Sequence, residues 1–525
     1  MKRLILLGLF VLLAFRSFSD SIIVSGEVSG VWNTDTVLVQ DDIFLAENNS
    51  LEIGGGCTVI FNHHSSFDVY GSLKAAGNMQ EQISFLVDDT TGFSDRGITQ
   101  GGWKGVRIYD RSSESDSVIF EHCRFTYSKA VDTTESLLNG GAIHVENFGR
   151  VKISHCSFEN NFAALNGGAI SLFNSGILIE ACEFVNNHCG PVDDPWGYGG
   201  AICSDSSDVK IIFNRFTDNT STGVGGGLAI RFLDARVCNN VFDSNYSALG
   251  GAMAFLHYHE NSHTQCNNLV FNNASEFFGG GIANIDAGPV FVNNTIVYNL
   301  SVYGGGFYVK DSLTPKVYNN IIWGNEALSG FGNQVYLWDY NACADFYYCL
   351  VEEGKEGFAG SGGGTGYQGT YENNIEISPL FADSLGHDYH LTAESPCINS
   401  GRPDTSGLQL PETGADSLPR ILNGRIDMGC YESLFTGFLP APEQNAFRIY
   451  PNPAGEWVHV EPESTFAGNS EFSILNLKGV SMKRIKSNEK NIQSIHIGEL
   501  PAGVYIIRMR HEKDYYSNVL IKNIK

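Results

Sequence analysis

Charge is what this 525-residue sequence has little of. Asp, Glu, Lys and Arg together make up 17% of the chain, and the acidic residues outnumber the basic ones, which gives a formal net charge of −25. A protein that binds the nucleic-acid backbone needs a basic patch, and an anionic membrane surface attracts basic segments. We therefore expect neither nucleic acid nor an anionic membrane surface as a partner.

Long apolar runs are also missing, except at the N-terminus. The run at residues 4–15 is too short for a membrane helix; Lys2 and Arg3 precede it, and the small residues Ser17 and Ser19 follow it. This pattern is typical of a secretory signal peptide, which we place at residues 1–19. No Cys follows the expected cleavage point, which argues against a lipid-anchored protein. The chain is therefore predicted to be exported.

The usual signatures of catalysis are absent too. The sequence has no Ser/His/Asp order, no Walker loop and no zinc pattern, and it lacks helical periodicity. Twelve Cys in an exported chain suggest disulfides. Many of them, however, occupy repeat positions that point inward, where Cys acts as a small hydrophobe. We expect most of them to be free or in the core.

What the sequence does have is a repeat between residues 120 and 325. One apolar column recurs most often 26 residues apart, at Phe125, Phe158, Phe184, Phe216, Phe242, Val270, Ile296 and Ile322. Two residues before it lie Cys123, Cys156, Cys182, Asn214, Asn240, Asn268, Asn294 and Asn320. Three residues after it lie Asn161, Asn187, Asn219, Asn245, Asn273, Asn299 and Asn325. A second column follows Gly-Gly pairs, at Ile143, Ile170, Ile202, Leu228, Met253, Ile282 and Phe307.

A fixed period of this length indicates a solenoid whose coils are made of short strands. Stacking the coils at about 4.8 Å buries a continuous core and lets the Asn amides bond one another in a ladder. We therefore interpret the repeated Asn and Gly as structural. The predicted fold class is all-β: a right-handed parallel β-helix (solenoid) followed by a small C-terminal β-sandwich. Residues 36–110 continue the coil less regularly and are expected to cap it.

Three stretches resemble known families. The repeats Asn-Asn-x-Phe and Gly-Gly-Ala-Ile resemble pectate-lyase-like right-handed β-helices, over about residues 36–380. The segments SPLFADSLGHDYHLTAESPCINSG and RILNGRIDMGCYE, within residues 378–433, resemble the choice-of-anchor Q module of bacterial surface β-helix proteins. Cys397 and Cys430 take positions that are usually small residues in that pattern, and the resemblance suggests a disulfide between them.

The third stretch is residues 446–525, with FRIYPNPAGEWVHV, EFSILNLKGV and IGELPAGVYIIRM. Its apolar runs, broken by Pro and Gly, predict a sandwich of about seven strands. It resembles the type A C-terminal sorting domain of the Bacteroidetes type IX secretion system. This resemblance implies two partners, the type IX secretion machinery and a sortase-like peptidase that removes the domain. It also implies an extracellular or cell-surface protein, often attached to lipopolysaccharide. Residues 434–445 are predicted to be the linker, and residues 20–377 the β-helix.

A candidate ligand site follows from two long turns at one edge of the solenoid. Residues 129–139 and 188–198 are insertions two coils apart, which is about 10 Å along the stack. Insertions on one face of a solenoid often mark its binding face. We expect Asp193, Asp194, Trp196 and Tyr198 of the second insertion to overhang this face.

Strand alternation after Gly-Gly places Ile143 and Val145 inside and His144 and Glu146 outside. The matching outward pairs are Ser171 and Phe173, Cys203 and Asp205, Ala229 and Arg231, Ala254 and Leu256, Ala283 and Ile285, and Tyr308 and Lys310. Small side chains in the first position of each pair predict a shallow groove lined by Glu146, Asp205 and Arg231.

Two interpretations of Asp205 and Arg231 stay open. In β-helical polysaccharide lyases, acids hold Ca²⁺ against a uronate carboxylate, and a basic side chain removes the adjacent proton. Asp205 and Arg231 are catalytic candidates on this basis, with Ca²⁺ as the one cofactor considered and Trp196 stacked on a sugar ring. The alternative is a surface ion pair. Asp193 and Asp194 are the one candidate acid pair for a glycoside hydrolase.

A metal is the last candidate ligand. His257 and His259 lie two apart, so on a strand they face the same way, with His263 shortly after them. No further ligand has convincing spacing beyond Glu260, which favours a solvated loop instead.

The predicted function is that of an exported surface or secreted β-helix that binds carbohydrate, cell surface or matrix. A polysaccharide lyase or hydrolase is the alternative, and a mere spacer is the third, because this scaffold serves enzymes and adhesins alike. Acids and a base converging in the groove favour the enzyme, and an aromatic strip favours binding.

Overall fold

The computed structural model describes most of the exported chain. The described residues are 20–109, 117–132, 135–190, 196–233, 235–258, 264–311, 313–435, 447–462, 470–476, 481–487, 493–511 and 514–523. The predicted signal peptide and most of the predicted linker lie outside them. The chain divides into two compact units, Met1–Gly437 and Phe438–Lys525. No helix among the described residues is long and apolar enough to cross a membrane.

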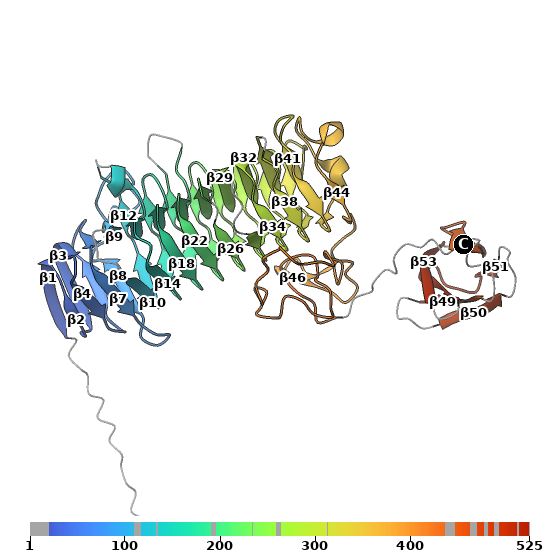
Figure 1. The fold of residues 1–525 in the computed structure, drawn as a ribbon, viewed down its shortest axis with the longest axis horizontal. Helices are drawn as coiled ribbons and strands as arrows, with labels where there is room; N and C mark the ends of the chain where they lie inside the picture. Colours follow the sequence, from blue (N-terminus) through green and yellow to red (C-terminus); the bar gives the residue numbers. More distant parts are fainter. Residues whose placement is uncertain are drawn as a thin grey trace, which may run out of the picture. The chain divides into compact units, whose positions relative to one another are not determined.

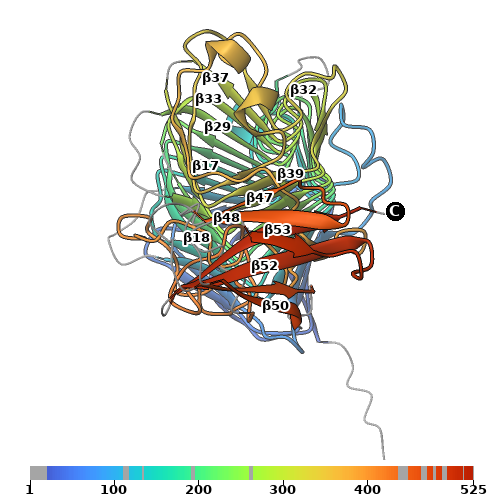
Figure 2. The same ribbon diagram turned by 90° about the vertical axis from the view of Figure 1, so that its right-hand side faces the viewer.

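The first unit is a parallel β-helix, as predicted. Figure 1 shows its strands stacked side by side along the solenoid, and Figure 2 looks along the stacks. Each regular coil contributes one strand to each of four stacks, and every pairing between successive coils is parallel. The coils begin at β1, because β1 pairs with β3.

One stack is a 13-stranded sheet, called sheet B here. Its strands are β2 (Gly30–Trp32), β4 (Ser50–Ile53), β7 (Ser72–Ala76), β10 (Val118–Glu121), β14 (Val151–Ser154), β18 (Gly176–Glu180), β22 (Asp208–Ile212), β26 (Arg236–Cys238), β30 (Thr264–Cys266), β34 (Val290–Val292), β38 (Lys316–Tyr318), β42 (Asp345–Tyr347) and β44 (Tyr371–Glu372).

Two further stacks share a 23-stranded sheet, because the long strand β3 pairs with β5 and with β6. The first arm holds β1 (Ser21–Glu27), β3 (Thr36–Leu45), β5 (Thr58–Phe61), β8 (Ile83–Val87), β11 (Cys123–Thr126), β15 (Ser157–Glu159), β19 (Glu183–Val185), β23 (Arg215–Thr217), β27 (Val241–Asp243), β31 (Leu269–Phe271), β35 (Thr295–Val297), β39 (Ile321–Trp323) and β43 (Leu350–Val351). The second arm holds β6 (Ser66–Val69), β9 (Gly105–Tyr109), β13 (Ile143–Glu146), β17 (Ile170–Phe173), β21 (Ile202–Asp205), β25 (Leu228–Arg231), β29 (Met253–Tyr258), β33 (Ile282–Ala287), β37 (Phe307–Lys310) and β41 (Val335–Leu337).

The fourth stack, called sheet D, has eight short strands that precede the Gly-Gly turns. They are β12 (Lys129–Ala130), β16 (Phe162–Ala163), β20 (His188–Cys189), β24 (Thr220–Ser221), β28 (Tyr246–Leu249), β32 (Ala274–Phe278), β36 (Leu300–Ser301) and β40 (Glu326–Ala327). Short 3₁₀ turns occur at η1 (Glu135–Leu138), η2 (Gly354–Gly357) and η3 (Gly364–Gly366), and a hairpin at β45 (Phe381–Asp383) and β46 (Asp388–Leu391).

Like residues stack in columns inside the solenoid, which explains the repeat. The rings of successive Phe from Phe85 to Phe242 are stacked 4.5–4.9 Å apart. In the Asn ladder, Asn245 donates from its side-chain amide to Asn273 Oδ1 at 2.9 Å, and it accepts from Asn219 at 3.0 Å. Each buried amide thus satisfies the polar groups of its neighbours, which the low-dielectric core requires. The predicted structural role of the repeated Asn is confirmed.

The cysteine prediction needs one correction. Cys397 and Cys430 are both free, buried thiols, whereas the one disulfide among the described residues joins Cys238 to Cys266 on the adjacent strands β26 and β30. The Cys430 amide donates to Thr295 Oγ1 on the solenoid at 3.0 Å, and the Cys397 amide donates to Ser395 Oγ at 3.2 Å. The two residues pack within one apolar cluster as small hydrophobes. The other free cysteines are buried except Cys343, as expected.

The end of the first unit folds back along the solenoid. Asn293 donates from its amide to the carbonyl of Asp427 at 2.7 Å, and Asn319 Oδ1 accepts from the backbone N–H of Arg402 at 2.7 Å. This terminal module, residues 378–435, also encloses a buried ion pair between Arg420 and Glu432 at 3.2 Å.

The second unit is the small β-sandwich that the sequence predicts. Its described strands are β47 (Phe447–Tyr450), β48 (Trp457–Pro462), β49 (Ser470–Leu475), β50 (Ser481–Ser487), β51 (Gln493–His496), β52 (Gly503–His511) and β53 (Asp514–Lys522). They form a three-stranded and a four-stranded antiparallel sheet around an apolar core of its own. Because this core is separate, the unit can fold as a domain.

Candidate functional site

A groove of about 390 Å³ lies on the second arm, across β13, β17, β21 and β25. Its lining includes His144, Glu146, Phe173, Asp205 and Arg231. Parallel pairing places Glu146 beside Phe173, Phe173 beside Asp205 and Asp205 beside Arg231, so these side chains form one row across four coils. The structure therefore brings together the three residues that the sequence predicted for the groove.

The first residue of each outward pair was predicted to face solvent, but in the structure it is buried. His144 is 3% exposed, and the residues that follow it in the row, Ser171 and Cys203, are also buried. The turn residues Asn139, Asn166 and Tyr198 pair coil to coil in a row of their own before the Gly-Gly turns. Small residues in the first position let this row of turns pack down on the arm. The first-position residues His144, Ser171 and Cys203 therefore form the buried floor of the groove, and the second-position residues Glu146, Asp205 and Arg231 are its more exposed members.

Arg231 is held from two sides. Its Nη1 lies 3.4 Å from Asp205 Oδ2, and its guanidinium lies over the Tyr198 ring at 4.0 Å from the centroid. Both the Asp205 and the Arg231 side chains keep about a fifth of their surface exposed. The ring and the carboxylate orient a guanidinium fork, which suits bidentate binding of a carboxylate or of paired hydroxyls.

His144 and Glu146 form the other end of the row. Burial lowers the pKa of His144, although Glu146 opposes this shift, so the imidazole is neutral at pH 7. The neighbouring His144 side chain lowers the pKa of Glu146, against partial burial, so this carboxylate is ionised. His144 Nε2 lies 3.7 Å from Glu146 Oε2. Glu146 therefore presents a fixed negative charge to the groove.

Arg107 is a positioning residue that the sequence analysis missed. Arg107 lies on β9, one coil before His144, and pairs with it in the row of first-position residues. Its side chain is fully buried. Its guanidinium donates to the carbonyls of Lys104, Asn139 and Gly140, the last at 2.8 Å. It thereby fixes the Asn139 turn that forms one edge of the groove. The sequence signal that could have revealed Arg107 is an Arg between two core residues of GGWKGVRIY, in register with His144 of the next coil.

An aromatic cluster, also missed, continues the row of turns toward the C-terminal end. The row runs from Tyr198 through Val224 and Leu249 to Phe278 and Tyr303. The aromatic cluster is defined here as Phe278, Tyr303, Tyr308, Tyr336 and Trp338.

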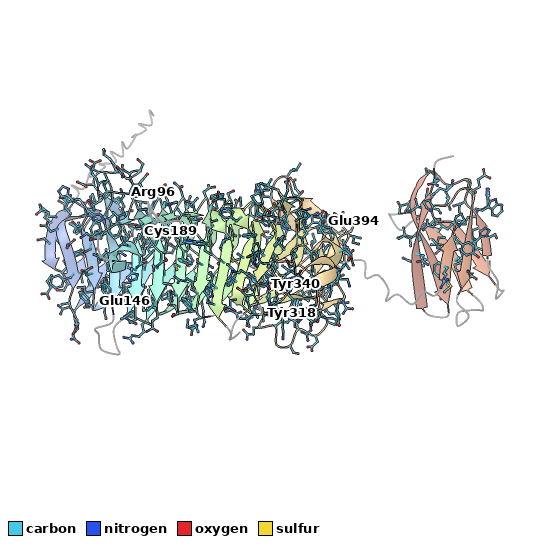
Figure 3. All side chains as sticks on the ribbon, turned by 90° about the horizontal axis from the view of Figure 1, so that it is seen from above. Arg96, Glu146, Cys189, Tyr318, Tyr340 and Glu394 are labelled. Atoms are coloured by element: carbon cyan, nitrogen blue, oxygen red, sulfur yellow. A yellow bond between two sulfur atoms is a disulfide. The ribbon has the colours of Figure 1, made fainter. Side chains whose placement is uncertain are left out.

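Within the aromatic cluster, the ring of Phe278 stacks on Tyr308 at 4.7 Å and meets Trp338 edge-on at 4.9 Å. Trp338 is 42% exposed. Figure 3 labels Glu146 toward the N-terminal end of the solenoid and Tyr340 toward its C-terminal end. Aromatic residues directly before several Gly-Gly pairs were the available sequence signal.

The predicted overhanging loop is described only in part. Asp193 and Asp194 lie outside the described residues. Trp196 is 47% exposed, and the neighbouring Gly197 packs close to Gly223 of the next coil. Tyr198 belongs to the row of turns and contacts Arg231. The loop therefore leads from an exposed indole directly to the groove.

His257 and His259 are candidate metal ligands by sequence, although the sequence favours a solvated loop. His257 has a φ of 58°, which interrupts the extended conformation on which a shared face with His259 depended. His257 Nδ1 lies 3.8 Å from Asp286, and its ring stacks on Phe232 at 5.7 Å. His259 and His263 lie outside the described residues.

Comparison with known families agrees with the two units. Residues 83–296 match the model of the right-handed β-helix region, and residues 448–523 match that of the secretion system C-terminal sorting domain. No curated protein and no solved structure matches the chain. The chain is therefore a right-handed parallel β-helix protein that carries a type IX secretion sorting domain, which directs it to the cell surface or the extracellular space.

Proposed function

We propose that the β-helix binds a polysaccharide along the face that holds the groove and the aromatic cluster. The observation that carries this proposal is their continuity: one row of turns joins Tyr198, which contacts Arg231 in the groove, to Phe278 and Tyr303 in the aromatic cluster. Carbohydrate recognition combines flat apolar surface with a few fixed polar groups. This face supplies both.

The two parts have separate tasks in this proposal. The exposed edge of Trp338 and the neighbouring rings stack on the apolar faces of sugar rings. Farther along the polysaccharide, Arg231 donates to carboxylate or hydroxyl oxygens, and Asp205 and Glu146 accept from sugar hydroxyl groups. Because the Arg231 fork is oriented by Tyr198, little side-chain entropy is lost when it binds a carboxylate. A uronate-containing polymer is therefore the favoured ligand.

A polysaccharide lyase or hydrolase is the second candidate, and the presence of Arg231 and Asp205 in one groove is the observation that favours it. A hydrolase needs one carboxyl group with a raised pKa as the general acid, whereas the pKa of Glu146 is lowered. For a lyase, Arg231 would have to leave its Asp205 partner to accept a proton. Binding requires neither change.

The experiment uses the full chain on a panel of uronate-containing and neutral polysaccharides. Binding is measured by calorimetry, and turnover by unsaturated product and reducing ends, with Ca²⁺ and with chelator. We expect binding without product, and about tenfold or greater loss of affinity in Trp338→Ala and Arg231→Ala. Phe213→Asn is the control, because Phe213 is 37% exposed at a turn whose counterparts in later coils are Asn.

Each outcome decides between the candidates. Calcium-dependent unsaturated product that Arg231→Ala abolishes would establish the lyase instead. Silence in both assays across the panel would contradict the proposal and leave the spacer. Equal loss of affinity in Phe213→Asn would place the ligand elsewhere on the solenoid.

A further inference from the structure

A different row of surface residues occupies the turn between sheet B and the first arm. Successive coils have a residue with positive φ there: His122, His155, Ala181, Phe213, Asn239, Asn267, Asn293, Asn319, Tyr348 and Asn373. Three of the Asn members, Asn239, Asn293 and Asn319, bond the backbone of the terminal module. In two successive N-terminal coils the same position is His. These two His therefore have a different environment from the three Asn that contact the terminal module.

The two imidazoles lie face to face at the surface. The rings of His122 and His155 stack with centroids 4.8 Å apart, and His155 is exposed. Glu121, the last residue of β10, immediately precedes His122. One ligand atom from each of Glu121, His122 and His155 lies within 4.8 Å of the other two, and no other such group of three occurs among the described residues.

No bonded neighbour within the described part of the chain explains this arrangement. Among the described residues, neither the two imidazoles nor the Glu121 carboxylate makes a side-chain hydrogen bond or an ion pair. The Lys74 ammonium donates to Glu52 at 2.7 Å, and Glu52, with a smaller contribution from the charge of Glu121, raises the pKa of Lys74. The Glu121 carboxylate is thus available for a further cation.

The donor set selects the kind of cation. Two imidazoles and one carboxylate are ligands that Zn²⁺ accepts, with bonds of about 2.0–2.2 Å, whereas Ca²⁺ and Mg²⁺ prefer oxygen alone. A tetrahedral ion with such bonds holds its ligand atoms roughly 3.4 Å apart. Binding of the ion therefore requires the three side chains to rotate, so that ligand atoms now within 4.8 Å of one another approach to that separation.

We propose that Glu121, His122 and His155 form a Zn²⁺ site that joins two successive coils of the solenoid. The ion takes one ligand from each His and one from Glu121, and a fourth position stays open to water or to an external ligand. The site is independent of the groove, because it lies at the turn beside sheet B and the groove lies on the second arm.

The test is titration of the full chain, purified without a polyhistidine tag, with Zn²⁺ alone. Calorimetry gives the stoichiometry, and Co²⁺ absorption in the visible range reports the ligand geometry. We expect one ion per chain in the wild type. His122→Asn and His155→Asn should each weaken binding by more than the roughly 10–100-fold that loss of an outer-shell partner costs. Both variants should fold, because Asn occupies this turn position, with positive φ, in five later coils.

His257→Asn is the matched control. His257 also has positive φ and lies 3.8 Å from a carboxylate, but within the described chain it has no second imidazole beside it. Retained binding in His257→Asn together with loss in His155→Asn supports the site. Absence of Zn²⁺ binding in the wild type, or loss of binding only in His257→Asn, would overturn it.

Discussion

At the scale of single residues, each buried side-chain amide of the Asn ladder makes several hydrogen bonds that connect neighbouring coils. Asn245 is 1% exposed, donates to Asn273 and to the carbonyl of Phe216, and accepts from Asn219. Removing its amide leaves donors and acceptors in both neighbouring coils without partners. Such orphaned buried groups cost more than the bond itself contributes.

Asn245→Ala should therefore lower the free energy of unfolding by about 2–4 kcal/mol, as measured by urea denaturation. Asn186→Gly is the control, because Asn186 makes its amide contact with Asn160 at the surface and Gly keeps the positive φ. We expect the control to change stability by less than about 1 kcal/mol. Equal losses in both variants would mean that burial of the ladder is unimportant.

At the scale of elements, one covalent bond connects successive strands of sheet B. Cys238 and Cys266 are 28 residues apart, and their Cα atoms are 4.5 Å apart. Alkylation of the denatured chain without reductant should label ten cysteines, and all twelve after reduction. Fewer labelled thiols, with Cys397 and Cys430 protected, would instead restore the pair that the family resemblance suggested.

The hairpin of the terminal module predicts a pH dependence. His390 Nδ1 lies 2.6 Å from Asp388 Oδ1, and Nε2 lies 3.7 Å from Asp416 Oδ2. Asp416, followed by Asp388, raises the pKa of His390 against partial burial. Burial opposes ionisation of both carboxyl groups, but their bonds with His390 lower the pKa of each.

The sign follows from these shifts. The His390 contribution is fully present below its unfolded pKa of about 6.5 and is lost as pH rises through the raised value. The carboxylate contributions are present above their unfolded pKa of about 3.9 and are lost as pH falls through the lowered values. Amide hydrogen exchange in β46, after correction for intrinsic rates, should therefore quicken as the pH rises above about 6.5 and through the raised pKa of His390.

His390→Gln serves as the control for this prediction. It should remove the extra quickening while leaving that due to other groups. An unchanged pH profile in His390→Gln would show that the three residues do not stabilise the hairpin.

At the scale of the whole molecule, two units with separate cores divide delivery from function. Deletion of residues 446–525 should leave a folded β-helix that stays inside the outer membrane, because the sorting domain directs type IX export. Surface labelling and fractionation measure this, and fusion of residues 434–525 to a reporter is the positive control. Surface display of the truncated chain would contradict the prediction.

The sequence by itself determined the coil, the inward and outward faces, and the export route. The reason is that stacking repeats one local pattern: Phe125, Phe158 and Phe184 are equivalent because each faces the same core one coil apart. The pairing of Asp205 with Arg231 followed from the same register.

Only the tertiary structure decided which outward residues meet solvent and which cysteines pair. His144 is buried because the turn that precedes its strand packs over it. The spacing of the sequence repeat does not predict how closely that turn packs on the strand. Cys397 and Cys430 are both free thiols buried in one apolar cluster, where their backbone N–H groups donate to Ser395 and to Thr295. The cluster of Glu121, His122 and His155 arises because two coils 33 residues apart in sequence become neighbours in space.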